Sequence, residues 1–451
     1  MAAIKTQATA EQQPLAEKKE RNIPLSNLSG FGEYELIEST VEGANVLNPE
    51  KKALRKIFLT DENRRADRQK LKESLQLMVE LLQGAEDIPS ILAEIHDKLR
   101  QTEAVLLKNT AKALEACREL EQNYRSVALF FNNTAREKVR NVTIYNLDID
   151  RLKDLDNTLA IDRISAELKS CHDRLDLRQN YSLMVIPGYL GSNTVVEKWA
   201  RIAHENKVLL VTDFQHIDDP DLVIEEFDKA NLTGPEMYRS NVIMACNWLV
   251  GRNRHADLGE EEELYIPPST ALAGKIYSTL ISQPTAGKLH GGIHDAKGVR
   301  FALKKSEISE LERRGLVPMV YEWDKVMAFS AKTLYNGPDI GLQTYSVVRV
   351  FEYIGKVLID FLNRQAFTKW TPKVQKDLGM EISRYLKSIK GHDKVIQDYK
   401  LMKLEQDPES KKIYIDLHIS PFFPAKNFLL KLGGTKGDTA EEWAAAFAEG
   451  S

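Results

Sequence analysis

The chain has 451 residues, of which 43% are hydrophobic and 28% are charged, and its formal net charge is -4. This length allows roughly two or three domains with a large buried core. The slightly acidic balance argues against a general nucleic-acid-binding protein, whose surface would be basic.

The start of the chain carries no recognisable targeting segment. The first residues, MAAIKTQATAEQQPLAEKKERN, contain no apolar run that could serve as a secretory signal, and no later stretch reaches the ~20 apolar residues of a membrane span. We therefore expect a cytoplasmic protein without membrane insertion. The cysteines Cys117, Cys171 and Cys246 are far apart, which predicts neither a disulfide framework nor a zinc site.

The N-terminal part is predicted to be helical. Residues 1–30 are polar and hold few large apolar side chains, so we expect a flexible arm. Residues 31–135 form the expected helical region. It begins with FGEYELIESTV, a short strand or the start of a helix, and continues with the amphipathic helix KLKESLQLMVELLQG, which ends at Gly84.

A later helix of this region carries one apolar stripe, because its apolar residues recur at intervals of three and four. Its members are Ala113, Cys117, Leu120, Tyr124, Val127 and Phe131. Such a stripe ordinarily packs inside its own chain. The alternative is that it docks on a partner.

Residues 136–400 are predicted to form an α/β core. NVTIYNLDID, YSLMVIPGYL and KVLLVTDF read as strands, and the helical segment NTVVEKWARIAHEN between the last two completes a β-α-β unit. The polar, Pro-containing and Gly-rich stretches within 215–300 predict surface loops. Two more strands follow in GLVPMVYEW and KVMAFSAKTLY, and then long helices across 342–366 and 372–390.

Residues 401–451 are predicted to hold a strand pair, a Gly-rich linker and a terminal helix. The first strand alternates apolar residues at Ile413, Ile415, Leu417 and Ile419, and the second does so at Phe428, Leu430 and Leu432. In the terminal segment TAEEWAAAFAEG, Thr439 and Glu442 fit a capping box, and Trp443 and Phe447 share a helical face.

An isolated two-stranded ribbon is marginally stable at best, because it has a single apolar face and two unpaired edges. Those edges are templates for a further strand. The predicted hairpin therefore needs further strands or a helix on top of it. One source of such strands is the α/β sheet of its own chain, which the hairpin would join as edge strands.

A search for chemistry finds no catalytic motif. The chain contains no phosphate-binding G-x-x-x-x-G-K-[ST] loop, no dinucleotide-binding G-x-G-x-x-G and no nucleophile elbow G-x-S-x-G. His290, His294 and Asp295 have metal-ligand spacing only on a helix, and Gly291 and Gly292 make a helix there unfavourable, so a surface loop is favoured. We predict no catalytic residue, cofactor or metal.

Three segments resemble one family. ERRGLVPMVYEWDKVMAFSAKTLYNGP, KLEQDPESKKIYIDLHISPFFPAKNFLLKLGG and the helix ALEACRELEQNYRSVALFFNNT are similar to the large subunit of the contractile sheath of bacterial type VI secretion systems, the TssC/VipB family. The resemblance covers about 105–160 and 300–434 and indicates a divergent branch. It implies a structural protein, not an enzyme.

The resemblance also implies partners. A small sheath subunit (TssB type) would pair with the helical region 31–135, and copies of the protomer would stack in a helical hollow assembly around an inner tube protein (Hcp type). Contraction from a baseplate would propel the tube, and an AAA+ ATPase would recycle the contracted form. Neighbouring protomers would share a small sheet. The expected interface residues are the strand positions named above, and Leu120, Tyr124, Val127, Trp443 and Phe447 are candidate docking positions.

Two other classes of function remain open from the sequence. One is an α/β enzyme with a small-molecule site at the C-terminal ends of strands 181–186 and 207–212, where Asp213 could line a crevice. A carboxylate that only caps the next turn is the simpler interpretation of Asp213. The other class is an adaptor protein built on the N-terminal helices.

Overall fold

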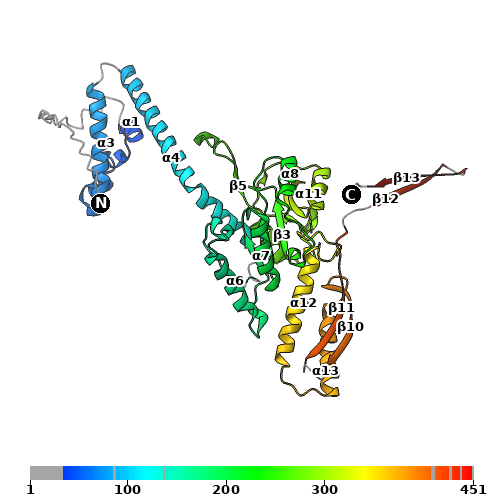
Figure 1. Cartoon of the computed structure of the whole chain (residues 1–451). Helices are drawn as coiled ribbons and strands as arrows, with labels where there is room; N and C mark the ends of the chain where they lie inside the picture. The colour runs from blue at the N-terminus through cyan, green and yellow to red at the C-terminus, as the bar shows by residue number, and fades with distance from the viewer. Residues whose placement is uncertain are drawn as a thin grey trace. The chain divides into compact units, whose positions relative to one another are not determined.

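The computed structural model of the chain describes residues 34–84, 88–135, 139, 141–407, 412–425, 429–436 and 439–448. The expected flexible arm, residues 1–30, lies outside these ranges. The chain divides into two compact units, Met1–Leu107 and Lys108–Ser451 (Figure 1). The division falls inside the long helix α4 (Ile88–Asn133) and not at the expected boundary after residue 135.

The described part of the first unit is helical, as predicted. Its elements besides the start of α4 are α1 (Tyr34–Thr40), α2 (Lys52–Thr60), α3 (Arg65–Gly84) and the 3-10 helices η2 (Ala44–Leu47) and η3 (Glu62–Arg64). FGEYELIESTV thus contributes a helix, and α3 ends at the predicted glycine. The core of this unit is small and centres on Val41, Ala44, Phe58 and Leu71.

The second unit is built on a six-stranded sheet. In spatial order its strands are β1 (Leu183–Ile186), β2 (Leu209–Asp213), β3 (Val242–Cys246), β8 (Leu316–Glu322), β9 (Lys325–Ala328) and β6 (Gly292–Ile293). The first four strands are parallel to one another, and β9 pairs antiparallel with both β8 and β6. The predicted β-α-β unit is confirmed as β1, α7 (Asn193–Glu205) and β2.

Helices cover both faces of this sheet, so its central strands are buried on both sides. In β2, Leu210 packs into one layer of the core while Leu209 and Val211 pack into the other. Helices α6 (Leu159–His172), α7, α8 (Pro220–Ala230) and α11 (Lys305–Arg313) contribute to the first layer, and α9 (Ser269–Ser278) with the end of α4 to the second. The predicted mixed α/β class is confirmed.

Short elements complete this region. They are α5 (Asp150–Lys153), α10 (Gly287–His290), the 3-10 helices η5 (Leu177–Gln179), η6 (Met237–Asn241) and η7 (Ala256–Leu258), and a three-stranded sheet of β5 (Leu264–Ile266), β4 (Leu249–Arg252) and β7 (Gly298–Val299).

Two sequence predictions for this region are wrong. NVTIYNLDID forms no strand, because no neighbouring strand pairs with it, and Ile144 is 64% exposed. The region 215–300 is not a set of surface loops, since it contains the buried central strand β3 and the buried helix α9. The strand VIMAC has no alternation to reveal it, because both of its faces are covered.

The C-terminal part of the unit begins with two long helices, α12 (Tyr345–Arg364) and α13 (Pro372–Ile389), as predicted. Two hairpins follow, each a separate two-stranded sheet: β10 (Ile396–Gln406) with β11 (Ile413–Pro421), and β12 (Leu429–Lys436) with β13 (Thr439–Ala448). Figure 1 shows α12 and α13 running alongside the first hairpin.

The expected pairing of the last strands is therefore wrong. β11 pairs with β10, which precedes it in the chain, and not with β12, which follows it. A hydrogen bond of 2.8 Å from Asp407 N to Lys412 O extends this ladder. β11 ends at Pro421 and Pro424 lies beyond it, and proline cannot donate to a strand ladder. The predicted terminal helix is strand β13, because pairing with β12 overrides the helix preference of its alanines.

Candidate subunit interfaces

The C-terminal half of α4 packs on the core through its polar face. Arg252, at the end of β4, bridges two carboxylates: Arg252 Nε lies 3.0 Å from Glu121 Oε1, and Arg252 Nη1 lies 2.6 Å from Glu260 Oε2. One turn further along α4, the hydroxyls of Ser126 and Thr270 are 3.2 Å apart and buried. These polar contacts thus fix which face of this half of α4 is turned towards the core.

The ion pair between Arg252 and α4 joins residues far apart in the sequence, so no local spacing reveals it. Arg252 and Glu121 are 131 positions apart, and only the fold brings them together. The hydrogen bond from Arg252 lowers the pKa of Glu260 from 4.5 to about 2. A carboxyl group with a lowered pKa stabilises the fold above its unfolded value, and this contribution is lost as the pH falls from 4.5 towards 2.

Arg252→Met is expected to loosen the C-terminal half of α4. The change leaves Glu121 and Glu260 without their shared cation at a partly buried site, at a cost of about 1–3 kcal/mol. Faster hydrogen exchange of the amides in the last three turns of α4 would measure it. The stability difference from the wild type should shrink as the pH falls from 4.5 towards 2. Over this range the folded wild type keeps Glu260 charged while its unfolded chain takes up the proton, so the contribution of the ion pair is lost. A pH-independent difference would contradict the ion-pair explanation.

The opposite face of α4 is apolar and points away from the core. Leu120 is 71% exposed, Tyr124 is 72% exposed and Val127 is 41% exposed. A helix on a globular core normally buries its apolar stripe and exposes its charges, so this arrangement is inverted. In the other unit, the start of α4 also exposes Leu92 and Leu99, at 51% and 50%.

The expectation that this stripe packs inside its own chain is therefore wrong for most of its members. The exposed members are Ala113, Cys117, Leu120, Tyr124 and Val127. Phe131 differs from them, since its ring meets Phe130 edge to face at a centroid distance of 5.2 Å. The stripe consequently remains available to a partner.

The apolar side of β11 faces its own chain. Ile415, Leu417 and Ile419 are partly buried against the core formed by α12, α13 and the start of β10. Ile413, which is 42% exposed, is not part of that core. The face of β11 is thus internal, and what this hairpin leaves open to another strand is its edges.

The second hairpin brings four predicted positions to one face. Leu430 pairs with Phe447, Leu432 with Ala445 and Gly434 with Trp443, so Leu430, Leu432, Trp443 and Phe447 occupy the same side of the ribbon. In the described part of the chain β12 and β13 pair only with each other. The seventh predicted strand position, Phe428, lies outside the described residues.

Asp213 lies at the C-terminal end of β2, as expected, but it is fully occupied. Its Oδ2 accepts from Gly188 N at 2.8 Å and from Ser269 Oγ at 2.5 Å, and its Oδ1 accepts from Ser269 N at 2.7 Å. Burial raises the pKa of Asp213 to about 7 against the effect of these hydrogen bonds. The carboxyl group ties the β1–α7 loop to the start of α9.

The sheet also lacks the geometry of a ligand crevice at this point. Such crevices form where neighbouring parallel strands connect in opposite directions. Here β1, β2, β3 and β8 follow one another in the same direction, and the helices that lead into β2, β3 and β8 all lie on one face. The C-terminal ends of strands 181–186 and 207–212, where the enzyme alternative placed its site, are therefore not at such a reversal of strand order.

Asp213→Ala is expected to destabilise the chain strongly, because it leaves two buried N–H groups without an acceptor. Each such group costs about 1–3 kcal/mol. Asp213→Asn should cost less, since the amide keeps one acceptor oxygen. Chemical denaturation measures the series, with Asp218→Ala at a 68% exposed carboxylate as the control. Equal stability of all three variants would contradict a tying role.

His290 ends the short helix α10, and His294 and Asp295 lie in the loop between β6 and β7. The Asp295 carboxylate accepts from Asn132 Nδ2 at 2.6 Å, and the backbone N–H of His294 donates to Asn133 Oδ1 at 2.7 Å. The loop thus secures the end of α4. Within the described ranges no cluster of three or more His, Cys, Asp or Glu side chains could hold a metal ion.

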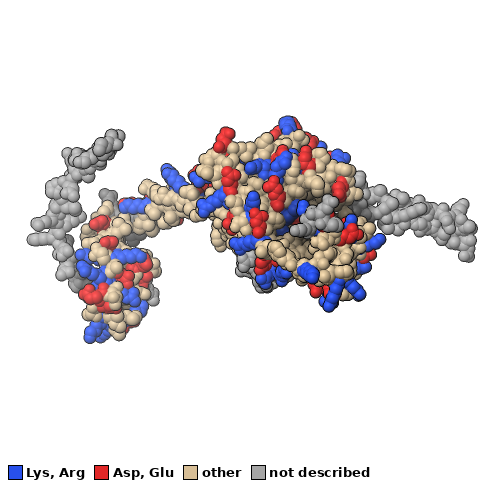
Figure 2. All heavy atoms as spheres, turned by 60° about the horizontal axis from the view of Figure 1, so that its bottom comes forward, with Lys and Arg blue, Asp and Glu red and all other residues tan. Residues whose placement is uncertain are grey.

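The molecular surface carries both signs of charge. Figure 2 shows Lys and Arg interspersed with Asp and Glu over the face in view, in keeping with the net charge of -4. Among the helices that the structure describes, none combines the length and the apolar character needed to cross a membrane.

Comparison with solved structures identifies the fold. The chain resembles the helical sheath of the anti-feeding prophage in its contracted state, with a TM-score of 0.50 and 14% identity over 69% of this chain and 81% of that chain. It also matches the baseplate structure of the anti-feeding prophage (TM-score 0.48, 16% identity, 69% and 80% of the two chains). A third match is the contracted sheath complex of PVC, an extracellular contractile injection system (0.48, 15%, 70% and 80%). No curated protein sequence matches the chain.

The fold is that of the sheath proteins of contractile injection machines. Family models for TssC/VipB of the type VI secretion system match in three consecutive parts: the N-terminal region over 22–110, the central domain over 112–336 and the C-terminal domain over 344–449. The chain belongs to the TssC/VipB family of type VI secretion systems, and it is a structural subunit of a contractile sheath. The resemblance stated from the sequence is confirmed.

Proposed function

We propose that the chain is the large sheath subunit of a type VI secretion system and pairs with a small sheath subunit (TssB type). Protomers of the two stack as copies in a hollow helical assembly around an inner tube protein (Hcp type). The assembly grows from a baseplate in the bacterial cytoplasm, and an AAA+ ATPase recycles it after contraction. The chain itself works mechanically and carries out no catalysis.

The observation that carries the proposal is the inverted orientation of α4. Its polar face is fixed to the core by Arg252 and its neighbours, and this leaves Leu120, Tyr124 and Val127 in solvent. Burying each such side chain contributes about 1.5–3 kcal/mol. A partner helix with its own apolar stripe would match this face, since an amphipathic helix is the natural complement of an exposed stripe at helical spacing.

The two C-terminal hairpins support the lattice contacts. Each is a two-stranded sheet in the described structure. The edges of such a ribbon carry unpaired N–H and C=O groups, which can bind a further strand. In the proposed assembly the termini of neighbouring subunits supply those strands and form a small shared sheet. Gly433 and Gly434, which the sequence predicted to belong to a Gly-rich linker, are ladder residues of β12 instead.

Coexpression with a small sheath subunit, followed by electron microscopy, tests the proposal. We expect hollow tubes with a cogwheel-like end view from the pair, and none from either subunit alone. A well-behaved small oligomer that never assembles in the presence of the small subunit would overturn the proposed function. Size-exclusion chromatography distinguishes the two outcomes before microscopy.

A further inference from the structure

Helix α12 turns most of its charged side chains towards the core of the second unit. A helix on a globular core normally buries apolar residues and exposes its charges, so this arrangement is inverted. Of its five charged residues, Arg349, Glu352, Lys356 and Asp360 follow one another at intervals of three and four and share one face. Arg364 pairs with Asp360. Each of the first four bonds to a different segment of the core.

Two of these residues donate hydrogen bonds to carbonyl oxygens of the core backbone. Arg349 Nη2 lies 3.1 Å from the oxygen of Ile276 in α9. Lys356 Nζ lies 2.8 Å from the oxygen of Tyr181, just before β1. Burial lowers the pKa of Lys356 to about 8, because its ammonium group is withdrawn from bulk water.

The two carboxylates accept hydrogen bonds from the core. The Glu352 carboxylate accepts from the side-chain amide of Asn241 in η6, and that amide also donates to Val208 O at 3.1 Å. Asp360 Oδ1 accepts from the backbone N–H of Leu177 in η5 at 3.0 Å. Charged groups of α12 thus meet the core at four separate places.

Uncharged side chains continue the row at both ends of α12. Tyr345 OH accepts from the backbone N–H of Thr285 at 2.8 Å, and Asn363 Nδ2 donates to the carbonyl oxygen of Leu175 at 3.3 Å. We call this row the polar seam, and its members are Tyr345, Arg349, Glu352, Lys356, Asp360 and Asn363. It extends along about five turns of the helix.

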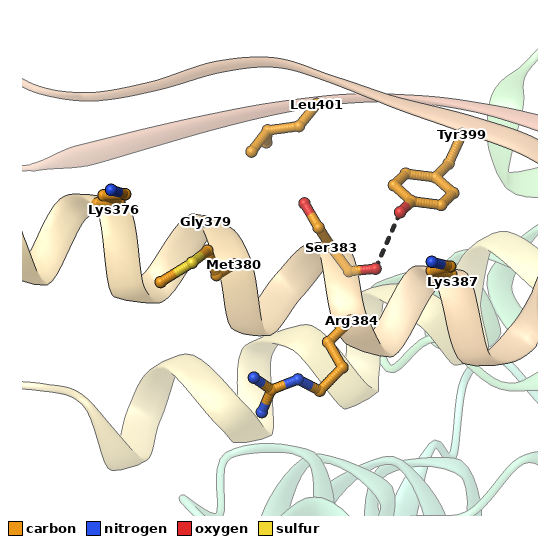
Figure 3. A pocket seen from close by; sticks show the side chains of 8 residues that line it. All are labelled: Lys376, Gly379, Met380, Ser383, Arg384, Lys387, Tyr399 and Leu401. Carbon is orange, nitrogen blue, oxygen red and sulfur yellow. Dashed lines mark hydrogen bonds between the residues drawn. The ribbon is translucent and has the colours of Figure 1, made fainter.

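The opposite side of α12 is apolar and carries the C-terminal module, by which we mean α13 with the hairpin β10–β11. Val350 and Ile354 of α12 are buried in a cluster with apolar side chains of this module, and that cluster is separate from the two cores around the six-stranded sheet. Figure 3 shows a bond inside the module: Tyr399 OH of β10 donates to the carbonyl oxygen of Ser383 in α13 at 2.9 Å. The module thus has a core of its own.

A short loop after α9 makes a second contact with the module. Ile281 packs against the apolar cluster of the module, and Ser282 Oγ donates to the carbonyl oxygen of Lys394 at 3.0 Å. This contact involves two neighbouring residues, whereas the polar seam involves six side chains spread along α12. The seam is therefore the more extensive of these two attachments.

A polar interface fixes position more strictly than an apolar one does. A shift of α12 along its axis by one turn, about 5.4 Å, would separate the six side chains from their partners. Partly buried charges and backbone groups would then be left unpaired, which is costly. Apolar surfaces tolerate such a shift better, because hydrophobic burial is not directional. Buried polar side chains fix the register of helices in coiled coils in the same way.

We propose that the polar seam is a positioning device, which fixes the place of the C-terminal module on the core. Its central positioning residues are Glu352 and Lys356. The consequence for the sheath rests on the proposed function: the edges of β10–β11 would keep a constant position relative to the core while subunits rearrange.

A distance measured inside one chain tests the role of the seam. Spin labels are attached at K198C on α7 and K376C on α13, two exposed positions. The C117S background is used because Cys117 is exposed while Cys171 and Cys246 are buried. The labelled full-length chain is diluted into an excess of unlabelled chain, so that double electron–electron resonance reports distances within one chain. We expect one narrow distance distribution for the intact seam.

E352M/K356M removes the middle of the seam without changing the net charge. Methionine fills a similar volume but offers no comparable hydrogen bond, so we expect the single distance to be lost and the distribution to broaden or divide. E94M/K98M is the matched control, because it makes the same two substitutions at the same spacing in an exposed ion pair of α4. The control should keep the wild-type distance.

Thermal unfolding shows which variants are folded. If E352M/K356M does not fold, D360M/N363M repeats the test at the C-terminal end of the seam. A folded seam variant that keeps the wild-type distance would overturn the inference, and so would an equal broadening in the control. Either result is distinct from failure of the proposed function, because the distance is measured without the small subunit and tube formation is measured with it.

Discussion

Aspartate at both Leu120 and Tyr124 is expected to abolish binding of a small sheath subunit while leaving the isolated chain folded. The two side chains are 71% and 72% exposed, so the free chain loses little buried surface. In the complex, each lost burial costs about 1.5–3 kcal/mol, and together they weaken binding by about a hundredfold or more. Co-purification measures binding, and denaturant unfolding measures the stability of the isolated chain.

The matched control places the same charges on another exposed surface. Leu159 and Leu175 are 77% and 76% exposed on the second unit, away from α4 in the sequence. Leu159→Asp with Leu175→Asp should bind the small subunit normally. If the α4 variant also binds as the wild type does, the outward stripe is not the docking surface.

The two C-terminal hairpins should respond differently to the same substitution, and this is the second large effect. Leu417→Asp places a charge against the core of α12 and α13, and it should destabilise the chain by about 2–4 kcal/mol. Leu430→Asp changes the ribbon β12–β13, which pairs with no other strand in the described structure, so the body should keep its stability while tube formation with the small subunit is lost. Denaturant unfolding and electron microscopy separate the two effects.

Ala446→Asp is the control for the ribbon. Ala446 pairs with Lys431, so it lies on the opposite face from Leu430 and Phe447, and the substitution adds the same single charge. It should permit tubes. Normal tubes from Leu430→Asp, or tubes lost equally in both variants, would show that the face shared by Leu430 and Phe447 is not an assembly contact.

Helices and strands with a regular spacing of apolar residues could be predicted from the sequence. The interval of three and four along 113–131 predicted a helix, and the alternation at 413–419 predicted a strand. The β1–α7–β2 unit was visible because a strand, a helix and a strand follow one another with short connections. The absence of catalytic motifs and the three family-like segments indicated a structural sheath protein.

Long-range partners could not be predicted in the same way. β11 has the same apolar alternation whether it pairs with β10 or with β12, so its sequence alone does not show that its partner is β10. The alanines of residues 439–448 favour a helix. This segment is nevertheless strand β13, because its backbone pairs with that of β12. Strand β3 was missed because burial on both faces removes the alternation.

The sequence by itself determined that α4 is a helix with an apolar stripe and that the chain ends in segments able to form ribbons. Only the tertiary structure decided which way the stripe faces, since Arg252 pairs with Glu121 of α4 and Glu260 pairs with Arg118 of α4. Periodicity specifies which residues share a face of an element. The groups that this face meets lie far away in the sequence, and only the folded chain brings them into contact.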